Sequence, residues 1–243
     1  MAWNYLVKWQ TFTVTVVFAH RGAHLNEREN TLEAFREAIR LGVAGVELDV
    51  RRTADGALVV HHDPFVDGVA IGHSAVRDLP SYIPSLDEAM EVLRGTTVNV
   101  EIKNSRGPKE PTYDETGSIV YQVLDYLHEA DLAPSVILSC FDVRTCAQAR
   151  SYDLELRVAW LVWDVPLPSA LTEAHVLGFD AVNPYFSLVT EESMDLANQL
   201  GLSINAWTVN APGDIQALAA LGVSSVITDQ PALAMKLLAS PSS

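Results

Sequence analysis

The chain has 243 residues, of which 49% are hydrophobic and 19% charged, a composition that excludes a disordered protein and allows a sizeable core. The formal net charge of −15 excludes a general binder of nucleic acid or of anionic membranes, because the long-range field of the protein repels both. No run of about 18 apolar residues occurs and residues 1–12 lack the features of a signal peptide, so we expect a cytoplasmic protein with no stable membrane insertion.

Short β-branched segments alternate with amphipathic segments of helical length along the whole chain. The predicted elements of the first half are a strand over 14–19, a helix from Asn30-Thr31 to Gly42, a strand over 45–50, a hairpin turn at Asp55-Gly56 leading into a strand over 58–61, a helix capped by Ser85 and a strand over 98–102. The second half continues with helices over 114–130, 142–151, 169–177, 191–200, 212–221 and 231–238, which alternate with strands over 136–139, 157–161, 181–183, 203–209 and 225–228.

This alternation predicts a parallel sheet of the α/β class. Eight strand–helix units in a chain of this length favour a closed (β/α)₈ TIM barrel over an open doubly wound sheet, with one short extra β-hairpin after the second strand. Neither G-x-G-x-x-G nor a P-loop is present, which removes the common nucleotide signatures of the open alternative. No linker interrupts the pattern, so we expect a single domain over residues 1–243, and nothing in the sequence fixes its oligomeric state.

Acidic side chains lie on two of the predicted strands, near the barrel end that carries the active site in this fold. Glu47 and Asp49 are two residues apart, so both point to the same face of their strand, and Glu101 lies on the next strand. Three carboxylates are hard oxygen ligands, which favours one divalent cation, Mg²⁺ or Ca²⁺. The alternative is a buried ion-pair network in which the same acids pair with three basic residues, Arg21, Arg51 and Lys103.

Histidines also lie near the predicted strand ends. His20 ends the first strand and is followed by Arg21, whose planar fork suits a phosphate, and by Gly22, which permits a tight turn or a close backbone approach. The pair His61-His62 ends the hairpin strand, where side-chain alternation places one ring inward and the other outward without deciding which. Catalytic-type residues on neighbouring strand ends favour an active site over an isolated core histidine.

Taken together, these motifs resemble the glycerophosphodiester phosphodiesterase family over nearly the whole chain. The more specific motifs are Phe18-Ala19-His20-Arg21-Gly22, Glu29-Asn30-Thr31, Gly45-Val46-Glu47-Leu48-Asp49-Val50, Thr53-x-Asp55-Gly56 and Val60-His61-His62-Asp63. Weaker ones follow at Glu101-Ile102-Lys103, Ser139-Cys140-Phe141-Asp142, Ala206-Trp207-Thr208-Val209-Asn210 and Thr228-Asp229-x-Pro231.

The resemblance implies a barrel that hydrolyses small-molecule glycerophosphodiesters to glycerol 3-phosphate and an alcohol. It assigns Glu47, Asp49 and Glu101 as metal ligands, His20 and His62 as the general acid–base pair, and Arg21, Lys103, Asn30 and Trp207 as substrate-binding residues. The attacking group, water or the neighbouring glycerol hydroxyl, is left open by the sequence.

The chain departs from the family pattern in two places. Arg28 replaces the usual proline before Glu29-Asn30, and the segment 65–83 is shorter than the insertion that commonly covers the site. The alternatives are therefore a phospholipase D-like or lysophospholipid phosphodiesterase on the same barrel, and a barrel that binds a phosphorylated ligand without turnover. An apolar, open pocket around residues 65–82, with Trp163, Tyr185 and Phe186, would indicate the lipid substrate.

Overall fold

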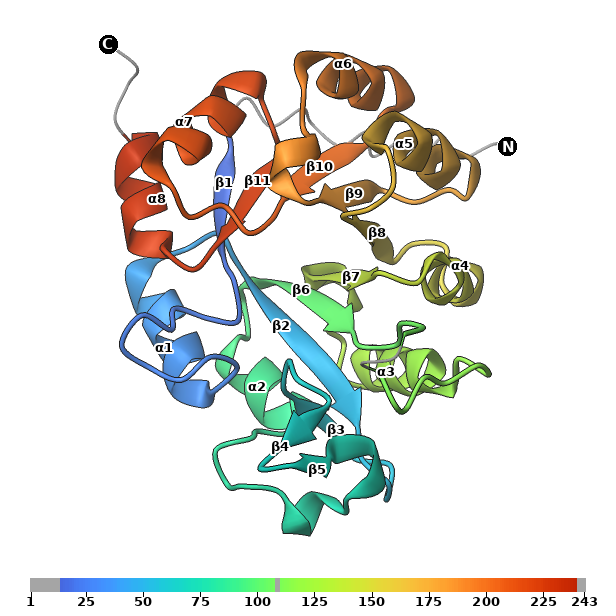
Figure 1. Ribbon diagram of the computed structural model, residues 1–243. Helices are drawn as coiled ribbons and strands as arrows, with labels where there is room; N and C mark the ends of the chain where they lie inside the picture. The colour runs from blue at the N-terminus through green and yellow to red at the C-terminus, as the bar shows by residue number, and fades with distance from the viewer. Residues whose placement is uncertain (1–13, 108–109, 240–243) are drawn as a thin grey trace.

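The computed structural model describes residues 14–107 and 110–239, so the N-terminal segment considered above for a signal peptide lies outside them. Eight parallel strands form the centre of the fold (Figure 1). They are β1 (Val16–Ala19), β2 (Gly45–Arg52), β6 (Thr97–Ile102), β7 (Val136–Cys140), β8 (Arg157–Val162), β9 (Ala181–Pro184), β10 (Ser203–Ala206) and β11 (Ser225–Thr228). Neighbours in this order pair in parallel, and β1 pairs with both β2 and β11, which closes the ring.

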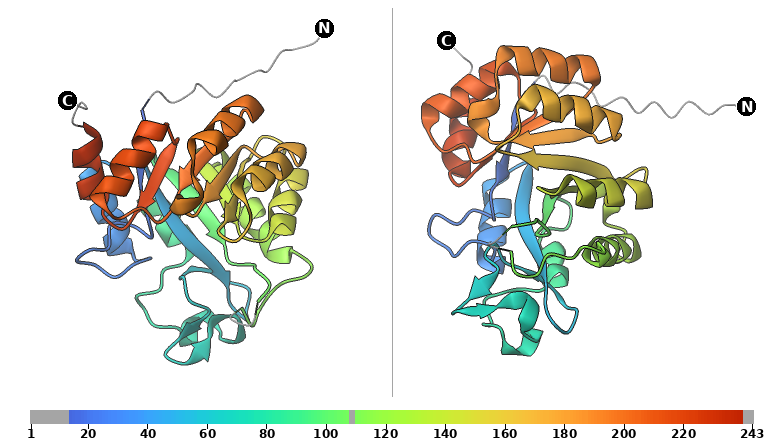
Figure 2. Two further views of the ribbon diagram at one scale, coloured as in Figure 1. Left: turned by 45° about the horizontal axis from the view of Figure 1, so that its top comes forward. Right: turned by 45° about the vertical axis from the view of Figure 1, so that its right-hand side comes forward.

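Each barrel strand is followed by a helix, which confirms the predicted TIM barrel. The helices are α1 (Leu32–Leu41), α2 (Leu86–Val92), α3 (Ser118–Glu129), α4 (Val143–Tyr152), α5 (Leu167–Val176), α6 (Glu191–Leu200), α7 (Pro212–Leu221) and α8 (Pro231–Ala239). They lie outside the ring of strands in all three views (Figures 1 and 2). Within the described part of the chain, no helix has the length and apolarity that crossing a bilayer requires.

The extra hairpin after the second barrel strand is also confirmed. Strand β3 (Leu58–Val60) pairs antiparallel with the end of β2. Beyond it, β4 (Phe65–Val66) and β5 (Val69–Ala70) form a second hairpin, followed by two short 3₁₀ helices, Ile71–His73 and Val76–Asp78. These later elements were not predicted, because two-residue strands are too short to produce a periodic pattern.

Two predicted boundaries lie three or more residues from the observed ones. The helix predicted over 114–130 begins at Ser118, because the Asp114 side chain accepts hydrogen bonds from the backbone N–H groups of Thr116 and Ile119, at 3.0 and 3.1 Å, and holds a turn before it. Gly117, with φ of 68°, completes that turn in the left-handed region. The strand predicted over 203–209 ends at Ala206, and the peptide bond that follows Trp207 is cis.

Alternation along β2 divides its side chains between two environments. Val46, Leu48 and Val50 are fully buried in the main hydrophobic core, where the helices cover the outer face of the barrel. Glu47 and Asp49 alternate with them, and Asp49 lies opposite Glu101 in the register with β6. The regular parallel pairing of β2 with β6 therefore brings the predicted carboxylates together.

Candidate active site at the C-terminal end of the barrel

A small cavity of about 90 Å³ lies at the C-terminal end of the barrel strands. Its lining residues are His20, Arg21, Glu47, His62, Asn99, Glu101, Lys103, Phe141, Leu161, Trp207, Thr208 and Ile227. Seven of the nine predicted site residues are among them, and the two that are not, Asp49 and Asn30, lie behind this lining and contact each other. The sequence thus predicted most of the polar lining, but not its two uncharged polar residues Asn99 and Thr208.

The three carboxylates form a compact buried group. Glu47, Asp49 and Glu101 each offer an oxygen atom, and these atoms all lie within 4.8 Å of one another. Carboxylate oxygens at this spacing are a donor set that suits a hard divalent cation. In the part of the chain that the structure describes, one other group, His20, His24 and Asp229, has comparable spacing, but it contains two imidazoles and a single carboxylate.

Two cations contact the carboxylate group. The Nζ atom of Lys103 lies 3.1 Å from Oδ1 of Asp49 and 2.7 Å from Oε1 of Glu101. The Nε atom of Arg21 lies 3.4 Å from Oδ2 of Asp49, and its backbone N–H donates to Oε2 of Glu47 at 2.9 Å. The Nη1 atom of Arg21 also donates to both carboxylate oxygens of Glu29, at 3.0 Å each. The predicted alternative of an ion-pair network thus holds for two of its three basic residues.

Arg51, the third basic residue of that alternative, points elsewhere. It forms a two-pronged ion pair with Glu110, at 2.8 and 2.9 Å, and donates from Nε to the backbone oxygen of His62 at 2.9 Å. Arg51 therefore holds the loop that carries His62 and forms its ion pair with Glu110, outside the carboxylate group.

The ionisation of the carboxylates differs from one to the next. Burial, followed by the charges of Asp49 and Glu101, raises the pKa of Glu47 well above its usual value. Burial would also raise the pKa of Asp49, but Lys103 and Arg21 outweigh it and hold that pKa below its usual range. The low pKa of Asp49 favours its ionised form, whereas the charge of Arg21 offsets only part of the rise in the pKa of Glu47.

The charge balance of the site favours an additional positive charge. Four carboxylates, including that of Glu29, face two cations, Arg21 and Lys103, which leaves an excess of two negative charges when all are ionised. Like charges at this separation in a buried site are costly unless a cation lies between them. The residues present therefore fit one divalent cation, both in donor chemistry and in charge.

His20 lies at the end of β1 with its two ring nitrogens in different environments. Nδ1 is 2.6 Å from Oδ1 of Asp229, and Nε2 is 3.9 Å from Oε2 of Glu47, on the side of the cavity. The backbone N–H of His20 donates to Thr228 at 3.0 Å, which continues the β1–β11 pairing by one residue. The ring is thus held between the last strand and the carboxylate group.

Of the two adjacent histidines, His62 lines the cavity and His61 is not among its lining residues. The Nδ1 atom of His62 is 2.9 Å from Oδ1 of Asp63. Burial lowers the pKa of His62, opposed by the charge of Asp49. A lowered pKa favours the neutral ring near neutral pH, which is the form that can accept a proton.

Asn30 contacts Asp49 instead of lining the cavity. Its Nδ2 donates to Oδ2 of Asp49 at 2.7 Å, and its Oδ1 accepts from the backbone N–H of Asp49 at 3.4 Å. The residue has a φ of 56°, in the left-handed region that asparagine tolerates better than most residues. Its predicted contact with substrate stays a prediction; its observed contacts orient a carboxylate.

The turn after His20 depends on a glycine, as predicted. A Cβ atom on Gly22 would lie 2.8 Å from Cβ of Ala34, closer than real Cβ contacts. Ala34 is in the first turn of α1. Thr31 caps this helix, because its side chain accepts a hydrogen bond from the backbone N–H of Ala34. This close approach packs the turn onto the helix and thereby places Arg21 beside the carboxylates.

Aromatic side chains form the apolar side of the cavity. Trp207 has its ring centroid 5.4 Å from that of Phe141 and 5.6 Å from that of Tyr185, and its Nε1 donates to Asn183 at 2.7 Å. Trp163 is 64% exposed. By contrast, no residue of segment 65–83 lines this cavity, and five of its side chains pack in a separate small core: Val66, Ile71, Leu79, Tyr82 and Ile83.

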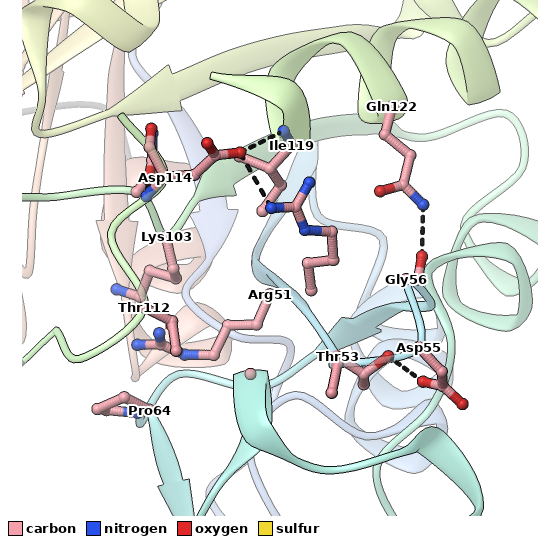
Figure 3. Close-up of a pocket in the computed structure, with 14 residues that line it drawn as sticks. Arg51, Thr53, Asp55, Gly56, Pro64, Lys103, Thr112, Asp114, Ile119 and Gln122 are labelled. Carbon is pink, nitrogen blue, oxygen red and sulfur yellow. Dashed lines mark hydrogen bonds and ion pairs between the residues drawn. The ribbon is translucent and has the colours of Figure 1, made fainter. Parts of the chain in front are cut away.

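A larger cavity of about 520 Å³ lies beside the site, between the end of β2 and the loop before α3 (Figure 3). Its polar groups are engaged with one another: Arg52 with Asp114 at 3.0 Å, and Thr53 with Asp55 at 2.6 Å. Lys103 lines both cavities, but its Nζ contacts the carboxylates described above. The chemistry is therefore concentrated in the smaller cavity.

Sequence reasoning did not assign roles to Asp229, Asn210 and His24, which surround His20. Thr228-Asp229 was recognised as a polar pair at the end of the last strand, which was the available signal for Asp229. His24 gives no such signal, because it lies in a loop without a periodic pattern.

Comparisons with known proteins agree with this arrangement. The model of the glycerophosphoryl diester phosphodiesterase family matches residues 20–82 and 73–233. A glycerophosphodiester phosphodiesterase of Caldanaerobacter subterraneus subsp. tengcongensis is 27% identical, over 92% of this chain and 98% of that protein.

Solved structures share the fold. The glycerophosphodiester phosphodiesterase of Thermotoga maritima is 25% identical, with a TM-score of 0.78 over 92% of this chain and 98% of that one. An Oleispira antarctica phosphodiesterase, in complex with its product sn-glycerol-3-phosphate, is 22% identical, with a TM-score of 0.82 over 93% of this chain and 98% of that one.

Proposed function

Because the chain belongs to the glycerophosphoryl diester phosphodiesterase family and is therefore a phosphoric diester hydrolase, we propose that it cleaves glycerophosphodiesters in the small cavity with a divalent cation and a histidine pair. One observation carries the proposal: three buried carboxylates whose oxygens lie within 4.8 Å of one another share this cavity region with His20 and His62. The products are glycerol 3-phosphate and an alcohol.

Glu47, Asp49 and Glu101 would hold the cation, which we take to be Mg²⁺ or Ca²⁺. When bound, such a cation polarises a phosphoryl oxygen and offsets its negative charge. Asn30 fixes the direction of the Asp49 carboxylate through the hydrogen bond of 2.7 Å, as supporting residues around a metal site commonly do.

Arg21 and Lys103 supply fixed positive charge on the same side of the cavity. Both are anchored by carboxylates, Arg21 by Glu29 and Lys103 by Glu101, so their positions are set before substrate arrives. Preorganised positive groups of this kind stabilise the negative charge that develops on the phosphoryl oxygens in the transition state. Trp207 and its aromatic neighbours would contact the carbon skeleton of the substrate.

His20 and His62 exchange protons with the reacting oxygens. One imidazole accepts the proton of the attacking group, water or the neighbouring glycerol hydroxyl, as the new P–O bond forms. If the hydroxyl attacks, water then opens the resulting cyclic phosphate to give glycerol 3-phosphate. The other donates a proton to the alkoxide as the old P–O bond breaks, so that a neutral alcohol leaves. A pair of imidazoles suits both roles near neutral pH.

A substrate panel tests the function. We expect release of glycerol 3-phosphate from glycerophosphocholine or glycerophosphoethanolamine in the presence of Mg²⁺ or Ca²⁺, measured together with the free alcohol. Turnover of lysophosphatidylcholine alone would assign the enzyme to lysophospholipids, the alternative for which the exposed Trp163, directly after β8, offers an apolar contact. Absence of product from every diester with either cation would contradict the proposal.

A further inference from the structure

We propose that Asp229 is a positioning residue that fixes the orientation and the tautomer of His20. The inference deepens the proposed function, because it rests on the assignment of His20 to the acid–base pair. It adds a residue that the carboxylate group and the two cations do not include.

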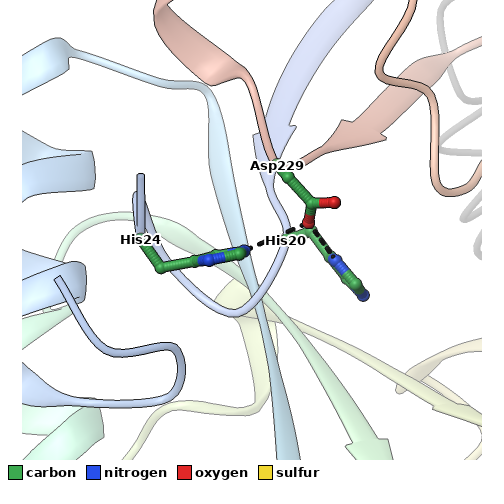
Figure 4. Close-up of side chains that lie close together, drawn as sticks. All are labelled: His20, His24 and Asp229. Atoms are coloured by element: carbon green, nitrogen blue, oxygen red, sulfur yellow. Dashed lines mark hydrogen bonds and ion pairs between the residues drawn. The ribbon is translucent and has the colours of Figure 1, made fainter. Parts of the chain in front are cut away.

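The barrel register sets Asp229 beside His20. Ala19 pairs with Thr228 at the ends of β1 and β11, so the residues that directly follow the two strands are His20 and Asp229. The two side chains meet at 2.6 Å between Nδ1 and Oδ1 (Figure 4). This contact joins residues at opposite ends of the chain and exists because the barrel closes at this strand pair.

Three donors converge on the Asp229 carboxylate. Oδ1 is also 3.1 Å from Nε2 of His24, and Oδ2 accepts from Nδ2 of Asn210 at 2.7 Å. A flip of the Asn210 amide, which would exchange Oδ1 and Nδ2, would break two hydrogen bonds. Its Oδ1 accepts from the backbone N–H of Asp229 at 2.9 Å and from the Thr228 hydroxyl at 3.1 Å. Asp229 therefore accepts from the Asn210 amide and faces one ring nitrogen of each of the two histidines.

The carboxylate remains ionised in this setting. Burial would raise the pKa of Asp229, but the hydrogen bonds from His20 and His24 outweigh it and hold that pKa below its usual range. An ionised carboxylate only accepts hydrogen bonds, so the proton of a neutral His20 ring must be on Nδ1. The lone pair is then on Nε2, which faces Glu47 and the cavity.

This arrangement matches a known physical role of an aspartate behind a catalytic imidazole. The carboxylate holds the ring in the tautomer that exposes the reactive nitrogen, and it stabilises the imidazolium that forms when Nε2 takes a proton. Without the carboxylate, the neutral ring is free to carry its proton on Nε2, and that nitrogen then has no lone pair with which to accept another proton.

Asp229→Asn tests the role with nearly unchanged shape. The asparagine amide must direct its NH₂ group either at Asn210 or at the two imidazoles, so one of the existing donors meets another donor. We expect kcat to fall by on the order of 10³- to 10⁴-fold with KM changed less than about threefold, as for the equivalent change in a serine protease triad. In ¹⁵N spectra, the neutral His20 ring should carry its proton on Nδ1 in the wild type and shift toward the Nε2–H form in the variant.

Asp153→Asn is the matched control. Asp153 accepts from Nε2 of His128 at 2.9 Å, so the variant disrupts an aspartate–histidine pair of the same kind outside the site. Its kcat should equal that of the wild type.

The outcomes separate the inference from the proposed function. Full activity of His20→Ala would overturn the histidine assignment itself. An inactive His20→Ala together with a fully active Asp229→Asn would overturn the positioning role alone. If Asp229→Asn does not fold, the ¹⁵N spectrum of the wild type still tests the positioning role. A neutral His20 with its proton on Nδ1 would support the role, and a proton on Nε2 would contradict it.

Discussion

Lys103 and Asp49 form a buried ion pair of 3.1 Å that links the end of β6 to the middle of β2. The pair has two consequences for the site. It keeps Asp49 ionised, and it keeps a positive charge beside the carboxylates whether or not a divalent cation is bound. An ion-pair network and a metal site are therefore compatible descriptions of the same residues.

Replacement of Lys103 tests this double role. Lys103→Met removes the charge with little loss of volume and leaves the buried Asp49 and Glu101 without it. We expect the free energy of unfolding to fall by about 3–5 kcal/mol, the typical cost of breaking a buried pair, and part of the loss to return with added Mg²⁺ or Ca²⁺. Denaturant unfolding with EDTA and with the cation measures both. A stability equal to the wild type would refute the structural role.

The two adjacent histidines provide a matched pair. His62→Ala should lower kcat by about 10²- to 10⁴-fold, the usual contribution of a general acid or base, because His62 lines the cavity. His61→Ala changes the same residue type one position away and should leave kcat within about threefold of the wild type. Steady-state kinetics on glycerophosphocholine measures kcat of both variants. A larger loss of kcat in His61→Ala than in His62→Ala would assign the acid–base role to His61.

The ionisation of Glu47 should make the free energy of unfolding of the cation-free protein depend on pH. Its pKa is raised by burial and by the neighbouring Asp49 and Glu101. A carboxyl with a raised pKa stabilises the fold while it is protonated, and this contribution is lost as the pH rises through that pKa.

EDTA-treated wild type should therefore lose stability with rising pH relative to Glu47→Gln, whose side chain stays neutral. Melting temperatures of both proteins between about pH 5 and about pH 8 measure the difference. Added Mg²⁺ or Ca²⁺ should remove the loss in the wild type, since the cation favours the ionised carboxylate. Parallel pH curves for the two proteins would contradict the role of Glu47.

Asn30→Gly isolates the hydrogen bond to Asp49, because glycine keeps the backbone φ of 56° at no steric cost. We expect the affinity for the activating cation to fall by about 10- to 100-fold, as for other residues that orient metal ligands. Asp131→Gly replaces another residue with a φ of 56°, beyond the end of α3, and should leave that affinity unchanged. Calorimetric titration with Ca²⁺ or Mg²⁺ measures both variants. Equal affinities would assign Asn30 to another role.

Strand periodicity was sufficient for the carboxylate group. Glu47 and Asp49 share one face of β2 at any register, and Glu101 meets them because neighbouring barrel strands pair in parallel. The alternation of strands and helices likewise predicted the eight-stranded barrel, because each unit repeats the same two patterns.

The histidines show where local patterns fail. Alternation could not choose between His61 and His62, and the structure gives the reason: β3 ends at Val60, so neither residue lies in a strand. The contact of Asp229 with His20 spans 209 residues and follows from ring closure, which no local pattern contains. The β4–β5 hairpin was missed because its strands are only two residues long.

We propose above that the buried carboxylates hold a cation that hydrolysis requires. The most direct test is the rate of glycerol 3-phosphate release from glycerophosphocholine by one enzyme preparation before EDTA treatment, after it, and after addition of excess Mg²⁺ or Ca²⁺. We expect turnover to be lost with EDTA and to return with one of these cations, and not to return in Glu47→Gln. Turnover that continues undiminished in EDTA would contradict it, and would leave Glu47, Asp49 and Glu101 as an ion-pair network alone.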